Sequence, residues 1–350
     1  MDDKTFNHIL NAAIAAPSAD NSQPWLYQRS GNTLQLHIDP SRSGSISDNR
    51  FVLSDLAIGA VIENICQQAH ALGFKNDVQY LPAGASSFHA ATIDFSEAIT
   101  TNSSLADSIH QRRTDRTFPW KGPVTDTVRE LLTAEAKRSR HNDLYWATDK
   151  KIKSAFIKIM SKAERLRYIN EELHDELFGS ICWDKGWQGF CDEGLSLPNL
   201  AVEPPARPFF SLMRNWSVQK VLNLLGASYT LALRSVVIPC RLSPGLCLLT
   251  TDDTSRTGII ETGRALQRVW LQATSQGLAI QPFAAAGIYS LGYIKGNEKL
   301  VSACSTIGTQ LKDLTKDKQG IIFLRLGYSR SPITGQNHRR AKDSFNLPTS

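Results

Sequence analysis

Two amphipathic segments with the same internal pattern constrain the fold of this chain more than any other feature. They span Leu53–Phe74 and Gly258–Leu278, and in each the apolar residues recur at helical spacing along one stripe. Each contains a glycine suited to a left-handed helix cap. Four identities fall at a constant offset of 204 residues between the two segments. Gly59, Gln68, Ala69 and Gly73 match Gly263, Gln272, Ala273 and Gly277.

A second pair of segments extends this internal similarity. Ile9–Ala13 resembles Leu131–Glu135, and each leads into a polar loop. Strand-like patterns occur at Leu34–Ile38, Ala91–Phe95 and Gly320–Tyr328. We therefore predict an α+β fold with a central mixed or antiparallel sheet flanked by helices. The repeat further predicts two divergent fused copies, residues 1–105 and residues 106–350.

The second copy carries extra material, at about 152–250. This segment reads as helical to about Phe178 and as loop-rich beyond it. It is either a surface insertion with its own small core or a lid over a pocket, because long insertions in compact domains are often binding loops. If it is a lid, aromatic residues such as Trp183 and Trp187 could stack on a planar substrate.

The charge and cysteine patterns exclude several classes of protein. The formal charge is +6, but the basic residues are scattered apart from Arg112/Arg113/Arg116 and Arg339/Arg340. Such compact clusters suit one phosphate better than a nucleic acid. The six cysteines form no C-x-x-C pair, so we expect no disulfide framework and no metal site. Without a signal-peptide pattern or a membrane-length apolar run, we expect a cytoplasmic monomer or homodimer with no membrane partner.

Two short motifs could recognise a ligand. Ala16–Trp25 reads APSADNSQPW, a polar loop that presents hydroxyl, amide and backbone groups, although a capped turn with Trp25 packed inward would look the same. Arg112–Phe118 reads RRTDRTF, in which Arg112, Thr114 and Arg116 share one face of an extended segment. They could cradle a phosphate, or the segment could be a solvated basic turn.

The order of these motifs resembles the nitroreductase family of FMN flavoproteins. In that family two subunits share each flavin, one through an arginine segment near the phosphate and the other through a P-S-x-x-N loop. The resemblance implies FMN contacts from the loop, the arginine segment, the strand after the second long helix and the C-terminal arginine pair. These residues are Pro17, Ser18, Ala19, Asn21, Gln23, Arg112, Arg113, Thr114, Arg116, Gln281, Pro282, Arg339 and Arg340.

The sequence departs from the usual family order in an informative way. An ordinary member carries the arginine segment before the P-S-x-x-N loop, whereas here the loop comes first. The second half has the arginine segment, but its own loop, Lys137–Leu144, lacks the Pro-Ser-Asn pattern. Each half thus keeps what the other lacks. The chain resembles the Acg-like branch, a fused pseudo-dimer with one surviving composite flavin site and a long insertion that covers it.

This resemblance implies electron transfer through FMN, from NADH or NADPH to a nitroaromatic, a quinone or an activated alkene. The cofactor would carry the chemistry, so we expect no catalytic side chain. The alternative is a flavoprotein that stores FMN or is redox-silent, because its lid blocks nicotinamide access.

Overall fold

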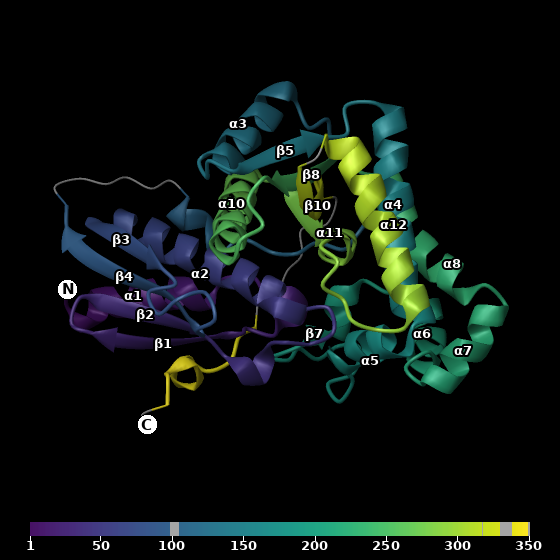
Figure 1. Ribbon diagram of the computed structural model, residues 1–350, viewed down its shortest axis with the longest axis horizontal. Helices are drawn as coiled ribbons and strands as arrows, with labels where there is room; N and C mark the ends of the chain where they lie inside the picture. Colours follow the sequence, from purple (N-terminus) through teal and green to yellow (C-terminus); the bar gives the residue numbers. More distant parts are fainter. Residues whose placement is uncertain (99–104, 317, 330–337, 349–350) are drawn as a thin grey trace.

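The first sheet forms from residues in the N-terminal part of the chain (Figure 1). The computed structural model describes residues 1–98, 105–316, 318–329 and 338–348. Four antiparallel strands in the order β1-β2-β4-β3 pack against the long helix α2. In chain order the elements are α1 (Asp3–Ile14), β1 (Trp25–Ser30), β2 (Thr33–Ile38), α2 (Val52–Ala71), β3 (Phe74–Tyr80) and β4 (His89–Glu97).

The second sheet repeats the first in strand order and connection. Its antiparallel strands follow the order β5-β8-β10-β9, and a helix again joins the second strand to the third. The matching elements are α3 (Asp126–Lys137), β5 (Asn142–Trp146), β8 (Gly245–Thr251), α10 (Arg256–Ser275), β9 (Ala279–Phe283) and β10 (Gln319–Gly327). α11 (Ala285–Ser290) and α12 (Glu298–Thr315) are added between β9 and β10.

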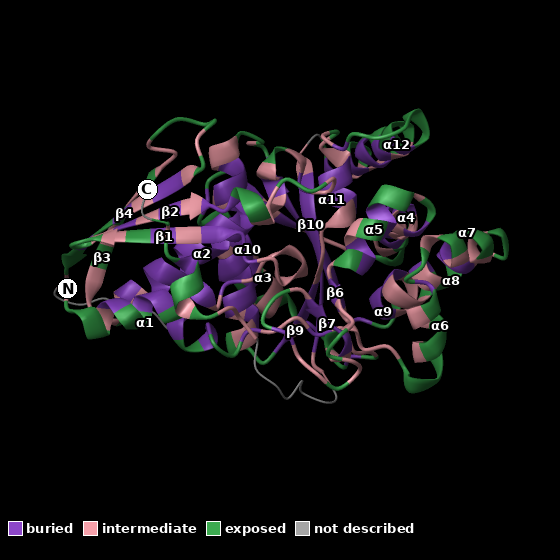
Figure 2. Ribbon diagram, turned by 90° about the horizontal axis from the view of Figure 1, so that it is seen from below, coloured by how far each residue is buried: buried purple, intermediate pink, exposed green. Residues whose placement is uncertain are grey.

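Helices α2 and α10 lie side by side at the centre of the molecule, where Figure 2 shows them largely buried. Both ends of α10 lie 204 residues after those of α2. A Cβ atom at Gly59 would lie 2.0 Å from the Ile260 carbonyl oxygen, and one at Gly263 would lie 2.1 Å from that of Leu56. Because Ile260 and Leu56 are also 204 residues apart, the two contacts are counterparts, as across a two-fold axis.

The predicted α+β fold is confirmed, and the strands form two antiparallel four-stranded sheets flanked by helices. The first sheet packs against α1 and α2, whereas the second sheet buries both faces, one against α3 and α10 and the other against α4 (Lys150–Ile169) and α12. Gly73 and Gly277 follow α2 and α10 with positive φ angles of 83° and 70°. These are the left-handed caps that the sequence predicts.

The long segment of the second half lies between β5 and β8 and extends to the right in Figure 1. The predicted end of this segment was at about 250, but residues 245–250 belong to β8. A small core gathers around Phe178 and Met213. The elements are α4 (Lys150–Ile169), α5 (Glu171–Gly179), β6 (Ile181–Cys182), β7 (Leu195–Ser196), α6 (Arg207–Leu212), α7 (Trp216–Leu224), α8 (Ala227–Ala232) and α9 (Ile238–Arg241).

No single helix in the described residues is long and apolar enough to cross a membrane. In the part of the chain that the structure describes, one pair of helices, Trp216–Leu224 and Ala227–Arg241, has the length and apolar composition of a membrane span when both are counted together, and the two helices meet at 95°.

Candidate functional site

The loop after α1 has a tightly fixed backbone. Asp20, Asn21 and Gln23 all have positive φ angles, between 49° and 56°. The Ser18 hydroxyl accepts a hydrogen bond from the Gln23 backbone N–H at 2.9 Å. Since left-handed conformations are costly for such residues, they persist only where surrounding contacts hold them. The loop is therefore a shaped surface, with Trp25 fully buried behind it.

Two buried arginines meet at the C-terminal end of α1. Arg112 donates to the Ala15 carbonyl at 3.2 Å, and its guanidinium lies 4.5 Å from the centre of the Trp270 ring. Arg339 donates to the carbonyls of Ile14 and Ala16 and, at 2.9 Å, to Oδ1 of Asn21. These carbonyls form the negative end of the helix and offset part of the positive charge.

Burial lowers the pKa of both arginines, and neighbouring arginines lower that of Arg112 further. Burial, together with the charges of Arg339 and Arg113, lowers the pKa of Arg112 to about 9. Burial lowers the pKa of Arg339 to about 10. Both remain cationic at neutral pH, but the charged form is disfavoured. A bound anion would relieve both effects.

The segment of Thr114 to Arg116 adds a further edge to the site. Thr114 forms a parallel bridge to Ile280 of β9, and the Asp115 N–H donates to the Ile280 carbonyl at 2.9 Å. The Asp115 carboxylate turns to Thr117, accepting from its N–H and hydroxyl at 2.7 Å. Arg116 donates to the Asn199 carbonyl of the insertion at 3.2 Å.

Two connected cavities open beside these segments. The larger, of about 450 Å³, runs between the two halves under the insertion, and the smaller, of about 100 Å³, lies at the arginines. Of the described charged residues lining the small cavity, four are arginines and one is an aspartate, Asp20. Both cavities are lined by Pro17, Ser18, Asp20, Thr114, Arg116 and Leu195.

Most of the predicted site residues line these cavities. The small cavity brings together Asn21, Arg112, Arg113 and Arg339 with the shared residues. Ala19, Gln281 and Pro282 line the large one, where Nε of Arg325 donates to Oε1 of Gln281 at 2.6 Å.

Gln23 and Arg340 line neither cavity and brace the surrounding segments. Nε2 of Gln23 donates to the Asp192 carbonyl at 2.7 Å, and its Oε1 accepts from the Arg340 N–H at 3.0 Å. The guanidinium of Arg340 donates to the Gln23 carbonyl at 2.9 Å.

The insertion supplies cavity residues that the sequence pattern did not reveal. Arg167 lies 3.8 Å from the Glu164 carboxylate, which also accepts from the Tyr168 hydroxyl at 3.1 Å, and all three line the large cavity. Trp183 and Trp187 do not line it. Trp183 stacks on Phe178 within the small core of the insertion. From this part of the insertion, Phe209 and Phe210 line the cavity instead, and Trp187 packs edge-on against Phe210.

The insertion is fastened across the loop and the first half. The Gly194 N–H donates to the Asn21 carbonyl at 3.4 Å, and the Glu176 carboxylate accepts from the Ser45 and Ser47 hydroxyls. Arg42 and Glu193 form an ion pair. A disulfide joins Cys182 to Cys191, so the expectation of no disulfide framework was wrong. Chain folding brings these two cysteines together across a tight loop, which their spacing did not indicate.

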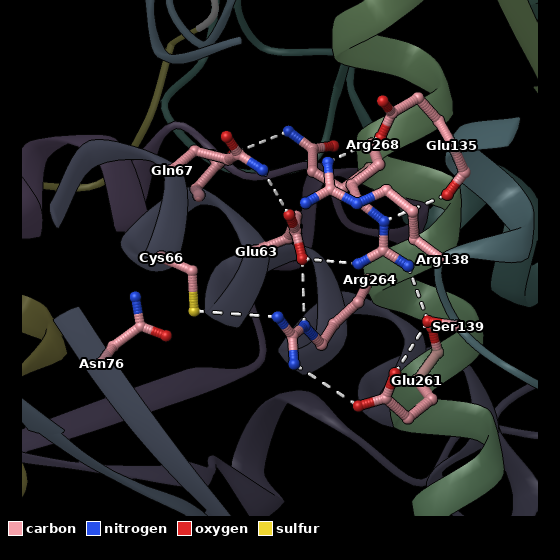
Figure 3. A network of polar contacts seen from close by, with 12 residues as sticks. Glu63, Cys66, Gln67, Asn76, Glu135, Arg138, Ser139, Glu261, Arg264 and Arg268 are labelled. Carbon is pink, nitrogen blue, oxygen red and sulfur yellow. Dashed lines mark hydrogen bonds and ion pairs between the residues drawn. The ribbon is translucent and has the colours of Figure 1, made fainter. Parts of the chain in front are cut away.

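The positions equivalent to the large cavity on the opposite side of the helix pair are filled (Figure 3). Ala57, Ala60 and Ala284 line the cavity, and their counterparts at the 204-residue offset are Glu261, Arg264 and Tyr80. These three larger side chains bond to one another, with Nη1 of Arg264 donating to the Tyr80 hydroxyl at 2.6 Å.

This network continues into the seam between the halves. Glu63 is buried between Arg264 and Arg268, at 3.0 and 2.8 Å. Ser139 donates to Glu261 from the short loop after α3. That loop runs only from 138 to 141, whereas its counterpart runs from 15 to 24. The side of the helix pair opposite the large cavity thus lacks both a long loop and an open space. The missing Pro-Ser-Asn pattern of the second loop indicated the first of these, and the filled space is found by comparing residues at the 204-residue offset.

Comparisons with known proteins agree with the motif order. The chain is 30% identical over 279 residues to the Mycobacterium tuberculosis protein named "Putative NAD(P)H nitroreductase acg", covering 77% of each chain. It is 26% identical over 286 residues to the M. tuberculosis relative Rv3131, covering 80% of this chain and 76% of that one. It is 25% identical over 320 residues to M. tuberculosis MT1398, covering 91% of this chain but only 43% of that longer protein.

No family model matches the chain. Among solved structures, a nitroreductase with bound FMN from Desulfitobacterium hafniense aligns with 98% of its chain and 70% of this one, at 13% identity and a TM-score of 0.38. NfnB from Mycobacterium smegmatis, solved with NADPH, aligns at 15% identity and a TM-score of 0.37. The sequence relationship to Acg assigns the family. The chain belongs to the nitroreductase family, in the branch of Acg.

Proposed function

We propose that this chain is an FMN-dependent oxidoreductase of the nitroreductase type, which holds one FMN across its two halves. The observation that carries the proposal is the pair of connected cavities, one small and cationic and one large and mainly apolar. An FMN molecule has the same two parts, a phosphate and a flat ring system. The residues that line both cavities would lie along the ribityl chain of FMN, which joins the phosphate to the ring system.

The small cavity fits a phosphate by its charge and donors. Guanidinium groups match phosphate oxygens well, because two parallel N–H bonds can form at once. The lowered pKa values of Arg112 and Arg339 mean that a dianion there would stabilise their charged forms. Thr114 and Ser18 add hydroxyl donors at the rim shared with the large cavity.

The large cavity fits a flat aromatic ring. On α2 it is lined by Leu53, Leu56, Ala57 and Ala60, and the small side chains of the two alanines leave room between the helix and β9. Arg116 and Gln281 lie along the same cavity, where they could bond the polar edge of the ring. The insertion closes over the cavity with Met160, Leu177 and neighbouring residues, which would exclude water from the ring.

FMN, when bound, would accept a hydride from NADH or NADPH and pass two electrons to a nitroaromatic, a quinone or an activated alkene. The chain itself would bind, orient and desolvate. No side chain needs to act as a nucleophile. Gln23 and Arg340 would act indirectly, by holding the loop and the C-terminal segment together.

We also propose that the chain is a fused pseudo-dimer, with one half at 1–105 and another at 106–350. The repeated strand order and the reciprocal glycine contacts support this division. One site per chain follows, because Glu261, Arg264 and Tyr80 occupy the space equivalent to the cavity. The insertion, from about 152 to the start of β8 at Gly245, would serve as the lid.

A second candidate is an FMN-holding protein without turnover, and the fastening of the insertion favours it. Contacts of Gly194, Glu193 and Glu176 with the first half hold the lid closed over the cavities. A lid that stayed closed would keep nicotinamide from the ring.

The first experiment measures flavin released by acid from the purified protein, before and after incubation with FMN. We expect one FMN per chain. Replacing Arg112 and Arg116 together by Ala should weaken FMN binding at least about tenfold per arginine, because each charge-assisted hydrogen bond contributes about 1.5–3 kcal/mol. The control is R138A/R140A, in the short second loop, which should bind FMN normally. A protein that takes up no FMN, or a double variant that keeps it fully, would refute the proposed site.

The second experiment separates the two candidates by mixing the flavin-loaded protein with NADH or NADPH without oxygen. Rapid bleaching of the flavin absorbance supports the reductase. Persistent colour supports the FMN-holding protein. In that case Glu176→Ala, which removes the bonds to Ser45 and Ser47, should make the flavin reducible.

A further inference from the structure

The outer end of the insertion exposes an unusual set of large apolar side chains. Leu224 and Leu225, at the turn between α7 and α8, are 86% and 83% exposed. Figure 2 shows α7 at the right edge of the molecule, in a mixture of exposed and intermediate colours. We call the exposed apolar residues of α6, α7, α8 and their ends the hairpin surface: Leu212, Val221, Leu224, Leu225, Tyr229 and Leu233.

The inward side of helix α7 carries polar as well as apolar side chains, since Leu222 packs on the core of the insertion and Trp216 lies against His174. The only fully buried residue of α7 is Gln219, whose side-chain amide bonds Asn223 at 2.9 Å. Asn223 in turn donates to the Tyr168 carbonyl at 2.6 Å. Val221 and Leu224 lie on the opposite side, in solvent. A helix on a protein surface normally buries its apolar face, so the exposed leucines are expected to contact something else.

The charge around this surface is mainly basic, and Arg234 is ion-paired with Glu203 at 2.8 Å. Residues 204–244 contain five basic residues and no aspartate or glutamate. Arg214, Lys220 and Arg241 are exposed, and Arg165 of α4 lies 3.4 Å from the centre of the Tyr229 ring. Exposed leucines and aromatics with basic residues around them are typical of helices that lie in a lipid–water interface.

We propose that the hairpin surface docks on an anionic membrane, with α7 and α8 in the headgroup region. The exposed leucines would enter the lipid, and the basic residues would contact acidic headgroups. Charge complementarity distinguishes this occupant from a second copy of the chain, because a symmetric contact would set the basic residues of one copy against those of the other. The proposal departs from the sequence-based expectation of no membrane partner.

The docked surface is continuous with the wall of the large cavity. Phe209 is 44% exposed and also lines the cavity, as do Thr230, Leu231 and Arg234 of the same helices. Membrane docking would therefore bring this wall to the lipid surface. The docking itself does not depend on the proposed flavin chemistry.

Flotation of the full chain with lipid vesicles tests the proposal directly and does not depend on flavin content. We expect the protein to float with vesicles of phosphatidylglycerol and phosphatidylcholine, and to float less with phosphatidylcholine alone or at high salt. The variant L224D/L225D should bind more weakly by on the order of a hundredfold, because two leucines leave the interface and two negative charges enter it.

The matched control is L131D/V301D, which changes two exposed apolar residues outside the hairpin surface in the same way. It should float like the unmodified protein. Equal loss in both variants, or no binding to anionic vesicles at all, would overturn the proposal. A dimer in solution that L224D/L225D dissociates, without vesicle binding, would also overturn it and assign the surface to a second copy.

Discussion

Replacing Gly59 by alanine should destabilise the protein, although alanine is the better helix former. The added Cβ would lie 2.0 Å from the Ile260 carbonyl oxygen, whereas ordinary contact begins at 3.4 Å. Helices α2 and α10 must therefore part by about 1.4 Å, since the neighbouring atoms are backbone and cannot rotate away. Overpacking costs about 3 kcal/mol at the upper end of its usual range, and the gain in helix propensity is about 1 kcal/mol. The net loss should be about 2 kcal/mol.

Equilibrium urea unfolding measures this loss against two comparisons. Gly263→Ala should cost a similar amount, because its contact with Leu56 is the counterpart at 2.1 Å. The double variant should cost less than the two changes added together, since one separation of the helices relieves both contacts. Gly179→Ala is the control, because a Cβ there meets nothing within 4 Å. A G59A protein within about half a kcal/mol of the unmodified protein would refute the reasoning.

Two further changes test the first sheet and the main cavity. Burial and the stacked His89 lower the pKa of His37 from 6.5 to about 4, so between these pH values the unfolded chain binds a proton that the folded chain does not. The free energy of unfolding, measured by urea unfolding at a series of pH values, should therefore fall as the pH drops through this window. In the His37→Gln variant it should fall less steeply, and an unchanged slope would contradict this. Ala60→Arg copies the counterpart residue Arg264 into the large cavity, and should sharply reduce the FMN bound per folded chain. Gln68→Arg, on the same helix but away from the cavity, is the control, and equal FMN content in both variants would argue against a flavin in this cavity.

The helices and the strand segments could be predicted because their signals are local. The apolar stripes of Leu53–Phe74 and Gly258–Leu278 correspond to α2 and α10, and glycine caps follow both. The order of the strands within each sheet could not be predicted from the sequence, since pairing depends on contacts between distant segments. The disulfide between Cys182 and Cys191 was missed for the same reason.

The candidate site was predictable in its motifs but not in its walls. The Pro17 loop and Arg112–Arg116 stand out by composition, and the family resemblance linked them. The contributions of Glu164, Arg167 and Tyr168 could not be foreseen, because the inward face of the insertion depends on how it folds over the first half. Likewise, Gln23 and Arg340 have the right residue types, yet they brace the site from outside it.

The repeat pattern, the order of the motifs and the missing Pro-Ser-Asn pattern of Lys137–Leu144 could be read from the sequence, because each is a pattern along one chain. Which space is open depends on contacts between segments that are far apart in the chain. On one side of the helix pair Ala57 and Ala60 leave a cavity, and on the other Glu261 and Arg264 fill the equivalent space with bonded side chains. Whether an alanine or an arginine on a helix leaves a cavity or fills it depends on the volume and the bonding partners of the residues on the opposite wall.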